Sequence, residues 1–227
     1  MNFEVDNKKI EIFYNESNQA KLPIVLLNTF EGEGKDVWKE CQNLNMDDFI
    51  LVAISNINWN DDLSPWECQP LYKNDSSYEG KANQYLEFLV TKVIPQAENI
   101  IKNKLNKQIK YWAIAGYSLA GLFALYSGYK TNIFKRIASA SGSLWYPSFI
   151  EYVKSNNINN NIDKIYFSLG NKEKNTKIEL LKTVEDRTKE IQSFLGNFIT
   201  TIYEENPGNH FQDAALRMAK GIDWILK

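Results

Sequence analysis

One serine stands in a setting typical of a catalytic nucleophile. Ser118 lies between Gly116 and Ala120, after an apolar, strand-like run and before an apolar, helix-like run. A strand that turns sharply into a helix at a serine forms a nucleophile elbow, which exposes the hydroxyl and requires very small residues two positions to either side. Gly116 and Ala120 are small enough, although Ala120 departs from the common G-x-S-x-G pattern. On this stretch alone, a serine in an ordinary tight turn is the alternative.

The chain contains a single histidine, His210, between the last predicted strand and the last predicted helix. Imidazole is the commonest general base for a serine nucleophile, so His210 is the one candidate for that role. A histidine in an exposed loop needs no function by itself. Its position after a strand, at the edge of the sheet where Ser118 is also expected, favours catalysis.

Glu173 is the predicted acidic partner of His210, because it lies in the loop that follows the strand predicted for residues 164–170. A carboxylate there would accept a hydrogen bond from the imidazole and fix its tautomer. Asp163 precedes the strand, so it should lie at the opposite edge of the sheet from Ser118 and His210. Glu204 and Glu205 follow the last strand and remain alternatives, and a solvated loop charge is the other interpretation of Glu173.

Acyl chemistry at Ser118 would also need two backbone N–H groups to stabilise an oxyanion. The Leu119 N–H, directly after the nucleophile, is the first. The second should come from the loop after the strand at 24–27, where Phe30 is the preferred donor and Thr29 the next candidate.

Several aromatic residues are candidates for binding an acyl or aryl group. Tyr117 precedes the nucleophile, Trp145 follows another predicted strand, and Trp59 and Trp66 lie in a long loop predicted for residues 56–78. Loops of this length in a compact domain are usually functional or disordered, and the aromatic content favours an ordered pocket wall. Ordinary packing beneath the loop explains each aromatic residue equally well.

The elements that would position these residues alternate between strand and helix over the whole chain. Buried strands are predicted at 24–27, 49–54, 111–114, 136–142, 164–170 and 197–203, after a hairpin over 3–14. This order predicts an α/β fold with a mostly parallel central sheet, helices on both faces and antiparallel N-terminal strands. We expect one domain over residues 1–227. In such sheets ligands bind outside the carboxyl ends of the strands.

Three sequence patterns typical of a helix N-terminus predict where helices begin. They are Ser76-x-x-Glu79, Thr176-x-x-Glu179 for a long helix to about residue 194, and the weaker Asn209-x-x-Gln212 for the final helix. Pro95 is expected to kink or end the helix that the first pattern starts.

Composition excludes several functions. Apolar residues make up 44% and charged residues 24%, with a net charge of −2, which is typical of a soluble globular protein and does not favour nucleic-acid binding. Cys41 and Cys68 have no metal-site spacing, and free thiols in a reducing cytoplasm are expected. The chain shows no nucleotide-binding glycine pattern, signal peptide or membrane span. We therefore expect a cytoplasmic protein that acts on a small molecule and uses no cofactor, metal ion or membrane. The sequence does not specify the oligomeric state.

Three stretches resemble the putative-esterase family of α/β-hydrolases: residues 116–125, 141–145 and 208–211. The family includes S-formylglutathione hydrolases, feruloyl esterases and ferric-siderophore esterases, and the siderophore-esterase-like branch is the most similar, from about residue 24 onward. The resemblance implies the α/β-hydrolase fold, with Ser118 as nucleophile and His210 as base. Family members usually carry Asp in the acid loop, where this chain has Asn171 and Glu173.

The sequence therefore predicts a serine esterase that hydrolyses a carboxylic ester through an acyl-enzyme on Ser118, with His210 as general base and Glu173 as acid. Acyl transfer to an alcohol is an alternative within the same chemistry. A non-catalytic binding protein of the same fold is the other alternative, motivated by Ala120 and the unusual acid loop. The residues do not specify the acyl or alcohol part of the substrate.

Overall fold

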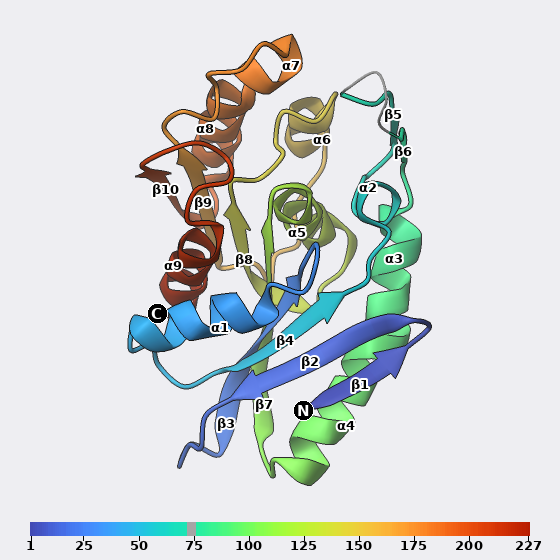
Figure 1. Ribbon diagram of the computed structural model, residues 1–227, viewed down its shortest axis with the longest axis vertical. Coiled ribbons are helices and arrows are strands. Elements are labelled where there is room, and N and C mark those ends of the chain that lie inside the picture. The colour runs from blue at the N-terminus through green and yellow to red at the C-terminus, as the bar shows by residue number, and fades with distance from the viewer. Residues whose placement is uncertain (72–75) are drawn as a thin grey trace.

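The computed structural model describes residues 1–71 and 76–227, in which a central sheet of eight strands is covered by helices (Figure 1). The strand order across the sheet is β1-β2-β4-β3-β7-β8-β9-β10. The bounds are β1 (Asn2–Val5), β2 (Lys8–Tyr14), β3 (Lys21–Asn28), β4 (Ile50–Ser55), β7 (Gln108–Tyr117), β8 (Phe134–Ala140), β9 (Lys164–Gly170) and β10 (Thr200–Asn206).

The sheet is antiparallel at its N-terminal edge and parallel elsewhere. β1 pairs with β2 and β2 with β4 in antiparallel register, whereas every neighbouring pair from β4 to β10 is parallel. The central strand β3 is buried at every residue after its first, as expected of a strand covered on both faces. The predicted α/β-hydrolase fold class, with its antiparallel start, is confirmed.

Helices cover the two faces in two layers. α1 (Gly34–Asn43) and α9 (Ala214–Leu226) pack side by side on one face (Figure 1). Their apolar residues form one core cluster with Val25 and Leu27 of β3, while Ile24 and Leu26 belong to the cluster on the other face. That second face carries α3 (Ala82–Phe88), α4 (Ile94–Lys104), α5 (Leu119–Lys130), α6 (Phe149–Ser155) and α8 (Val184–Leu195). Successive side chains of β3 thus point to opposite faces of the sheet, as expected of a strand.

The helix start predicted at Ser76-x-x-Glu79 is wrong. Glu79 belongs to a short strand, β6 (Tyr78–Glu79), which pairs with β5 (Glu67–Cys68), and its N–H donates to Asp61 Oδ1 at 3.2 Å. The helix begins at Ala82 instead. The loop predicted for 56–78 thus contains β5 and the one-turn helix α2 (Trp59–Asp62), and its residues 72–75 lie outside the described residues.

Of the two outcomes predicted for Pro95, a kink or an end of the helix, the end is wrong, because α4 continues past the proline. A π-helical segment, η1 (Leu89–Val93), joins α3 to α4, and Pro95 occupies the first turn of α4. Proline lacks an N–H and its ring clashes with the carbonyl four residues earlier, here that of Thr91. Because Thr91 lies in the wider π-helical turn, the chain continues through the proline.

The other two predicted helix starts lie too early. Thr176 accepts a hydrogen bond from the Ile178 N–H at 3.2 Å and so forms a local turn, after which α7 (Glu179–Lys182) and α8 replace one long helix. Asn209 accepts from the Phe211 N–H at 3.0 Å in the same way, and α9 begins only at Ala214. Short polar side chains that bond the backbone two residues ahead favour turns as readily as helix caps.

Candidate active site

Ser118 occupies a strained turn between β7 and α5. Its backbone has φ 57° and ψ −123°, a conformation that a residue with a side chain rarely adopts. A Cβ atom on Gly116 would lie 2.2 Å from the Ala120 carbonyl oxygen and 2.7 Å from the Ala120 Cβ. The close approach of strand and helix therefore requires glycine at 116 and a small residue at 120. This is the local geometry predicted for the elbow.

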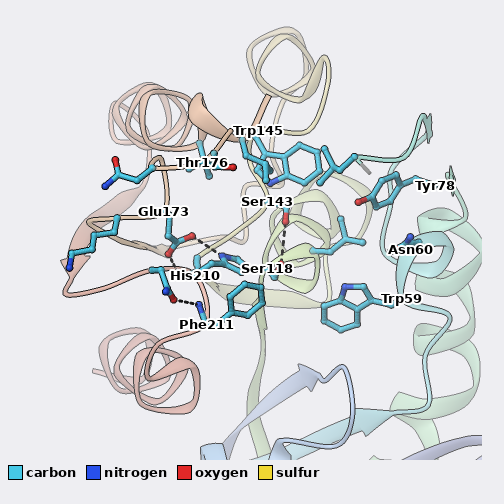
Figure 2. A pocket seen from close by; sticks show the side chains of 18 residues that line it. Trp59, Asn60, Tyr78, Ser118, Ser143, Trp145, Glu173, Thr176, His210 and Phe211 are labelled. Carbon is cyan, nitrogen blue, oxygen red and sulfur yellow. Dashed lines mark hydrogen bonds and ion pairs between the residues drawn. The ribbon is translucent and has the colours of Figure 1, made fainter. Parts of the chain in front are cut away.

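The structure brings together the serine, the histidine and the glutamate predicted from the sequence (Figure 2). His210 Nε2 lies 3.0 Å from Ser118 Oγ, and His210 Nδ1 lies 2.8 Å from Glu173 Oε2. The three residues follow β7, β10 and β9, so all three lie at the carboxyl edge of the parallel sheet. With a proton on Nδ1, the imidazole donates to Glu173 and its Nε2 accepts from the Ser118 hydroxyl.

The Glu173 carboxylate is buried and fully engaged. Its side chain is 4% exposed, and Oε1 accepts from Ser141 Oγ at 2.8 Å and from the Gly170 N–H at 2.5 Å. Burial alone raises the pKa of Glu173. The hydrogen bond and charge of His210, with the Gly170 and Ser141 donors, outweigh burial and hold that pKa below its usual range. The group is therefore ionised at neutral pH.

Arg217, which the sequence reasoning missed, lies beneath this group and is 1% exposed. Its Nη1 lies 3.2 Å from Glu173 Oε1, 3.3 Å from Ser141 Oγ and 3.2 Å from the Tyr117 hydroxyl oxygen. Its Nη2 donates to the Pro207 carbonyl at 2.7 Å. One guanidinium thus joins the acid loop, the end of β7 and the loop that carries His210.

Tyr117 contributes to the same support. Its hydroxyl donates to the His210 carbonyl at 2.7 Å, and its ring lies 5.5 Å from the imidazole. The residue predicted to bind substrate therefore uses its polar atom to hold the histidine loop, and only its ring is left to line a cavity.

The structure excludes one of the three backbone N–H groups that were predicted as hydrogen-bond donors to an oxyanion. Leu119 is the first residue of α5, where an N–H has no partner within the helix. The Thr29 N–H donates to the Ile54 carbonyl at 2.9 Å and is not available. The Phe30 N–H makes no hydrogen bond within residues 1–71 and 76–227. Leu119 and Phe30 thus remain the two candidates.

Two cavities meet at Ser118, and both are also lined by His210, Trp59 and Phe211. The first has a volume of about 380 Å³, and we call it the polar chamber because it is the more polar of the two. It is lined by polar residues, which include Asn60, Ser143, Lys172, Asn175 and Asn209, and by apolar residues, which include Leu71, Trp145, Leu181 and Val184. The second, the apolar chamber, has a volume of about 490 Å³ and is lined by Leu27, Phe30, Val37, Tyr117, Ala215 and Met218, among others.

The tryptophans predicted as substrate-binding residues have different positions. Trp145 lines the polar chamber. Trp66 lines neither chamber, because its indole N–H donates to the Pro147 carbonyl at 3.0 Å and its ring packs against Tyr146 and Tyr152. The substrate-binding role predicted for Trp66 does not fit this position. Trp59 borders both chambers instead.

Glu173→Gln should lower the free energy of unfolding at pH 7, and the difference from the wild type should shrink on acidification. Because the pKa of Glu173 is lower in the folded chain, its ionised form stabilises the fold above the ordinary value near 4.5. This contribution is lost as the pH falls through the lowered pKa. Urea unfolding between about pH 7 and pH 3 measures the difference. A difference that stays constant over this range would contradict the expectation.

Side chains that commonly bind metal ions do not cluster in the part of the chain that the structure describes. No group of three or more His, Cys, Asp or Glu side chains there could hold a metal ion.

Cys41 and Cys68 are free thiols, and burial with the nearby Asp223 charge raises the pKa of Cys41 to about 12. None of the helices among the described residues combines the length and the apolar character that a membrane span requires.

A family model and a curated relative match most of this chain. The family model described as "Putative esterase" matches residues 28–215. The uncharacterized protein YbbA of Bacillus subtilis is 20% identical over 191 residues, which cover 81% of this chain and 76% of that protein.

The solved structures that share the fold include two hydrolases. The siderophore hydrolase EstB of Aspergillus nidulans superposes with a TM-score of 0.79 at 15% identity, over 100% of this chain and 94% of that chain. An IroE-like serine hydrolase from Shewanella oneidensis superposes with a TM-score of 0.74 at 17% identity, over 96% of this chain and 75% of that chain.

Proposed function

The chain belongs to the putative esterase family and is a carboxylic ester hydrolase, and from this premise we propose that it cleaves its ester through an acyl-enzyme on Ser118. The observation that carries the proposal is the continuous hydrogen-bonded chain from Ser118 Oγ to His210 at 3.0 Å and from His210 to Glu173 at 2.8 Å. A nucleophile, a base within hydrogen-bond reach and a third group that orients the base form the arrangement that acyl transfer needs.

In the first half-reaction, Ser118 Oγ attacks the ester carbonyl carbon while its proton passes to His210 Nε2. The resulting oxyanion accepts hydrogen bonds from the Leu119 and Phe30 N–H groups. The bond between the carbonyl carbon and the alkoxy oxygen then breaks. The imidazolium returns its proton to that oxygen, so that a neutral alcohol leaves and the acyl group stays on the serine.

In the second half-reaction, a water molecule attacks the acyl carbon and gives one proton to His210 Nε2. The bond to Ser118 Oγ breaks, and the serine recovers its proton from the imidazolium. The products are one alcohol and one carboxylic acid, and the enzyme returns to its starting state. Glu173 stabilises the imidazolium in both half-reactions because it stays ionised beside Nδ1.

A fluorophosphonate should form a covalent adduct with the wild-type protein at Ser118. The activated Oγ displaces fluoride from phosphorus, and the stable product gives one mass increment on the peptide that contains residue 118. Intact-mass and peptide mass spectrometry measure it, with Ser118→Ala as the control that should stay unlabelled. Labelling of another serine, or none at any reagent concentration, would contradict the proposal.

A further inference from the structure

Resting on the proposed function, we infer that the two chambers separate the two arms of the ester. The apolar chamber takes the acyl arm and the polar chamber takes the alcohol arm. The preferred substrate class is then an ester between an apolar carboxylic acid, longer than acetic acid, and an alcohol that carries hydrogen-bonding groups. Ser118 and His210 line both chambers, so each chamber borders the reacting groups.

The apolar chamber is built to hold a hydrocarbon or aryl group. Its base consists of buried side chains from β3, α1 and α9, namely Leu27, Val37 and Met218. Ala214 and Ala215, at the start of α9, are half-buried, and their short side chains leave the space open. A volume of about 490 Å³ lies within the range of small-ligand sites.

The acidic residues at this chamber narrow the acyl class further. Glu33 and Asp36 belong to its lining, next to the apolar base. The Glu33 carboxylate accepts the Glu31 N–H at 3.1 and 3.2 Å, so it is held in the loop before α1. Two carboxylates disfavour an acyl arm that ends in a second carboxylate, because like charges repel. An uncharged apolar acyl group is therefore the best match.

The polar chamber is the more polar of the two, because amides, hydroxyls and a lysine line it beside the apolar side chains of Leu71, Leu181 and Val184. It is lined by the amides of Asn60, Asn175 and Asn209 and by the Lys172 side chain. Ser143 Oγ lies 3.4 Å from Ser118 Oγ, so a hydroxyl borders the reacting atom on this side. Figure 2 shows Ser143 and Trp145 on one side of Ser118, with Trp59 and Phe211 on the other. Such groups can bind the hydroxyls or amides of an alcohol.

The second half-reaction assigns the arms. The acyl group stays on Ser118 after the alcohol leaves, and the attacking water must take the alcohol's place beside His210 Nε2. The chamber with several amides and a lysine in its lining offers water more hydrogen-bond partners than the chamber with a base of Leu27, Val37 and Met218, so the polar chamber refills more readily with water. The reverse arrangement would place an apolar acyl group over polar side chains and deprive them of partners.

Exposed aromatic rings mark the boundary between the chambers. Phe211 is 87% exposed and Phe30 is 56% exposed, and the Phe30 ring lies edge-on to Trp59 at 5.1 Å. Phe211 and Trp59 line both chambers. Large apolar side chains left in solvent around a cavity mouth indicate a ligand that covers them. An ester whose apolar arm lies between the rings of Phe30, Trp59 and Phe211 would cover these side chains.

The test compares acyl length in the wild type and in Ala215→Phe. In the wild type, kcat/KM for p-nitrophenyl octanoate should exceed that for the acetate ester by about tenfold or more, because added methylenes are bound in the apolar chamber. In Ala215→Phe the octanoate-to-acetate ratio should fall by about tenfold, because the new ring fills the chamber. Ala215→Leu, a smaller change, should give an intermediate ratio.

Asn175→Phe is the matched variant in the other chamber. It should leave the octanoate-to-acetate ratio within about twofold of the wild type and should lower kcat/KM for octanoate esters of glycerol relative to those of methanol. If instead Asn175→Phe changes the acyl ratio and Ala215→Phe changes the alcohol preference, the assignment of the arms is overturned.

The proposed function and this inference fail in different ways. If Ser118 is labelled by a fluorophosphonate and acetate esters are hydrolysed, but Ala215→Phe leaves the acyl ratio unchanged, the inference is overturned and the acyl-enzyme stands. If Ser118 is not labelled and Ser118→Ala retains the activity, the acyl-enzyme itself is overturned, and the assignment of the arms falls with it.

Discussion

Replacing Ser118 by alanine should reduce kcat for p-nitrophenyl acetate by about 10⁴- to 10⁶-fold, the range seen when the nucleophile of a serine hydrolase is removed. Alanine keeps the Cβ and the backbone geometry but leaves nothing to form the acyl-enzyme. The Leu119 and Phe30 N–H donors and both chambers stay in place, so any residual rate reports binding and oxyanion stabilisation alone. Steady-state hydrolysis followed by absorbance, with circular dichroism to verify folding, measures the effect.

Ser118→Gly is the informative control for this prediction. It should be as inactive as Ser118→Ala but more stable by about 1 kcal/mol, because glycine adopts the φ of 57° at this position without a Cβ penalty. Urea unfolding of the two variants gives the difference. Activity of Ser118→Ala within about tenfold of the wild type would contradict a nucleophilic role for Ser118. Equal stability of the two variants would contradict backbone strain at the elbow.

The parts of the site that depend on chain order were predictable from the sequence. Ser118, Glu173 and His210 each follow a strand of a parallel sheet, and parallel strands bring the residues after their carboxyl ends to one edge. The β-α alternation that predicts the sheet was readable because strands buried on both faces appear as continuous apolar runs.

The helix starts were less predictable, because the same side chains can bond the backbone in a turn, in a strand or at a helix cap. Glu79 pairs with Glu67 in a two-stranded sheet whose strands are too short to produce an alternating hydrophobic pattern in the sequence. Trp59 and Trp66 look alike in sequence, seven residues apart in one loop. Only the packing of the loop separates the one that borders Ser118 from the one that packs against Tyr146 and Tyr152.

The acid loop that carries Glu173 contacts the histidine loop at Gly170. A Cβ atom on Gly170 would lie 2.4 Å from the Gly208 carbonyl oxygen and 2.8 Å from Arg217 Nη1. The glycine therefore lets the acid loop and the histidine loop touch. Between them, the longer side chain of Glu173 reaches His210 with one oxygen and the Ser141 and Gly170 donors with the other.

Arg217 could not have been identified from the sequence, since its partners come from four separate segments and its helix position resembles any other charged position on α9. Arg217→Met should lower the free energy of unfolding by about 3 kcal/mol, because it leaves the buried Glu173 carboxylate without its cation. It should also lower kcat with little change in KM, since the Pro207 carbonyl and the Tyr117 hydroxyl lose the group that holds the His210 loop.

Arg217→Lys and Arg187→Met make this expectation specific. Lysine keeps the positive charge, but its single ammonium group cannot contact both Glu173 and Pro207 as the planar guanidinium does. Arg217→Lys should therefore have a stability between those of the wild type and Arg217→Met. Arg187 pairs with the exposed Glu151 at 3.4 Å, and its replacement by methionine should change stability by less than about 1 kcal/mol. A loss of stability in Arg217→Met no larger than in Arg187→Met would contradict the structural role.

A double-mutant cycle separates the charge pair from the packing of Arg217. In a Glu173→Gln background the site no longer holds a buried carboxylate, so Arg217→Met should cost less than it does in the wild type. A coupling of about 1 kcal/mol or more would assign the effect to the Arg217–Glu173 contact at 3.2 Å. Additive losses would mean that the guanidinium acts through the Pro207 and Tyr117 contacts, which hold the histidine rather than the acid.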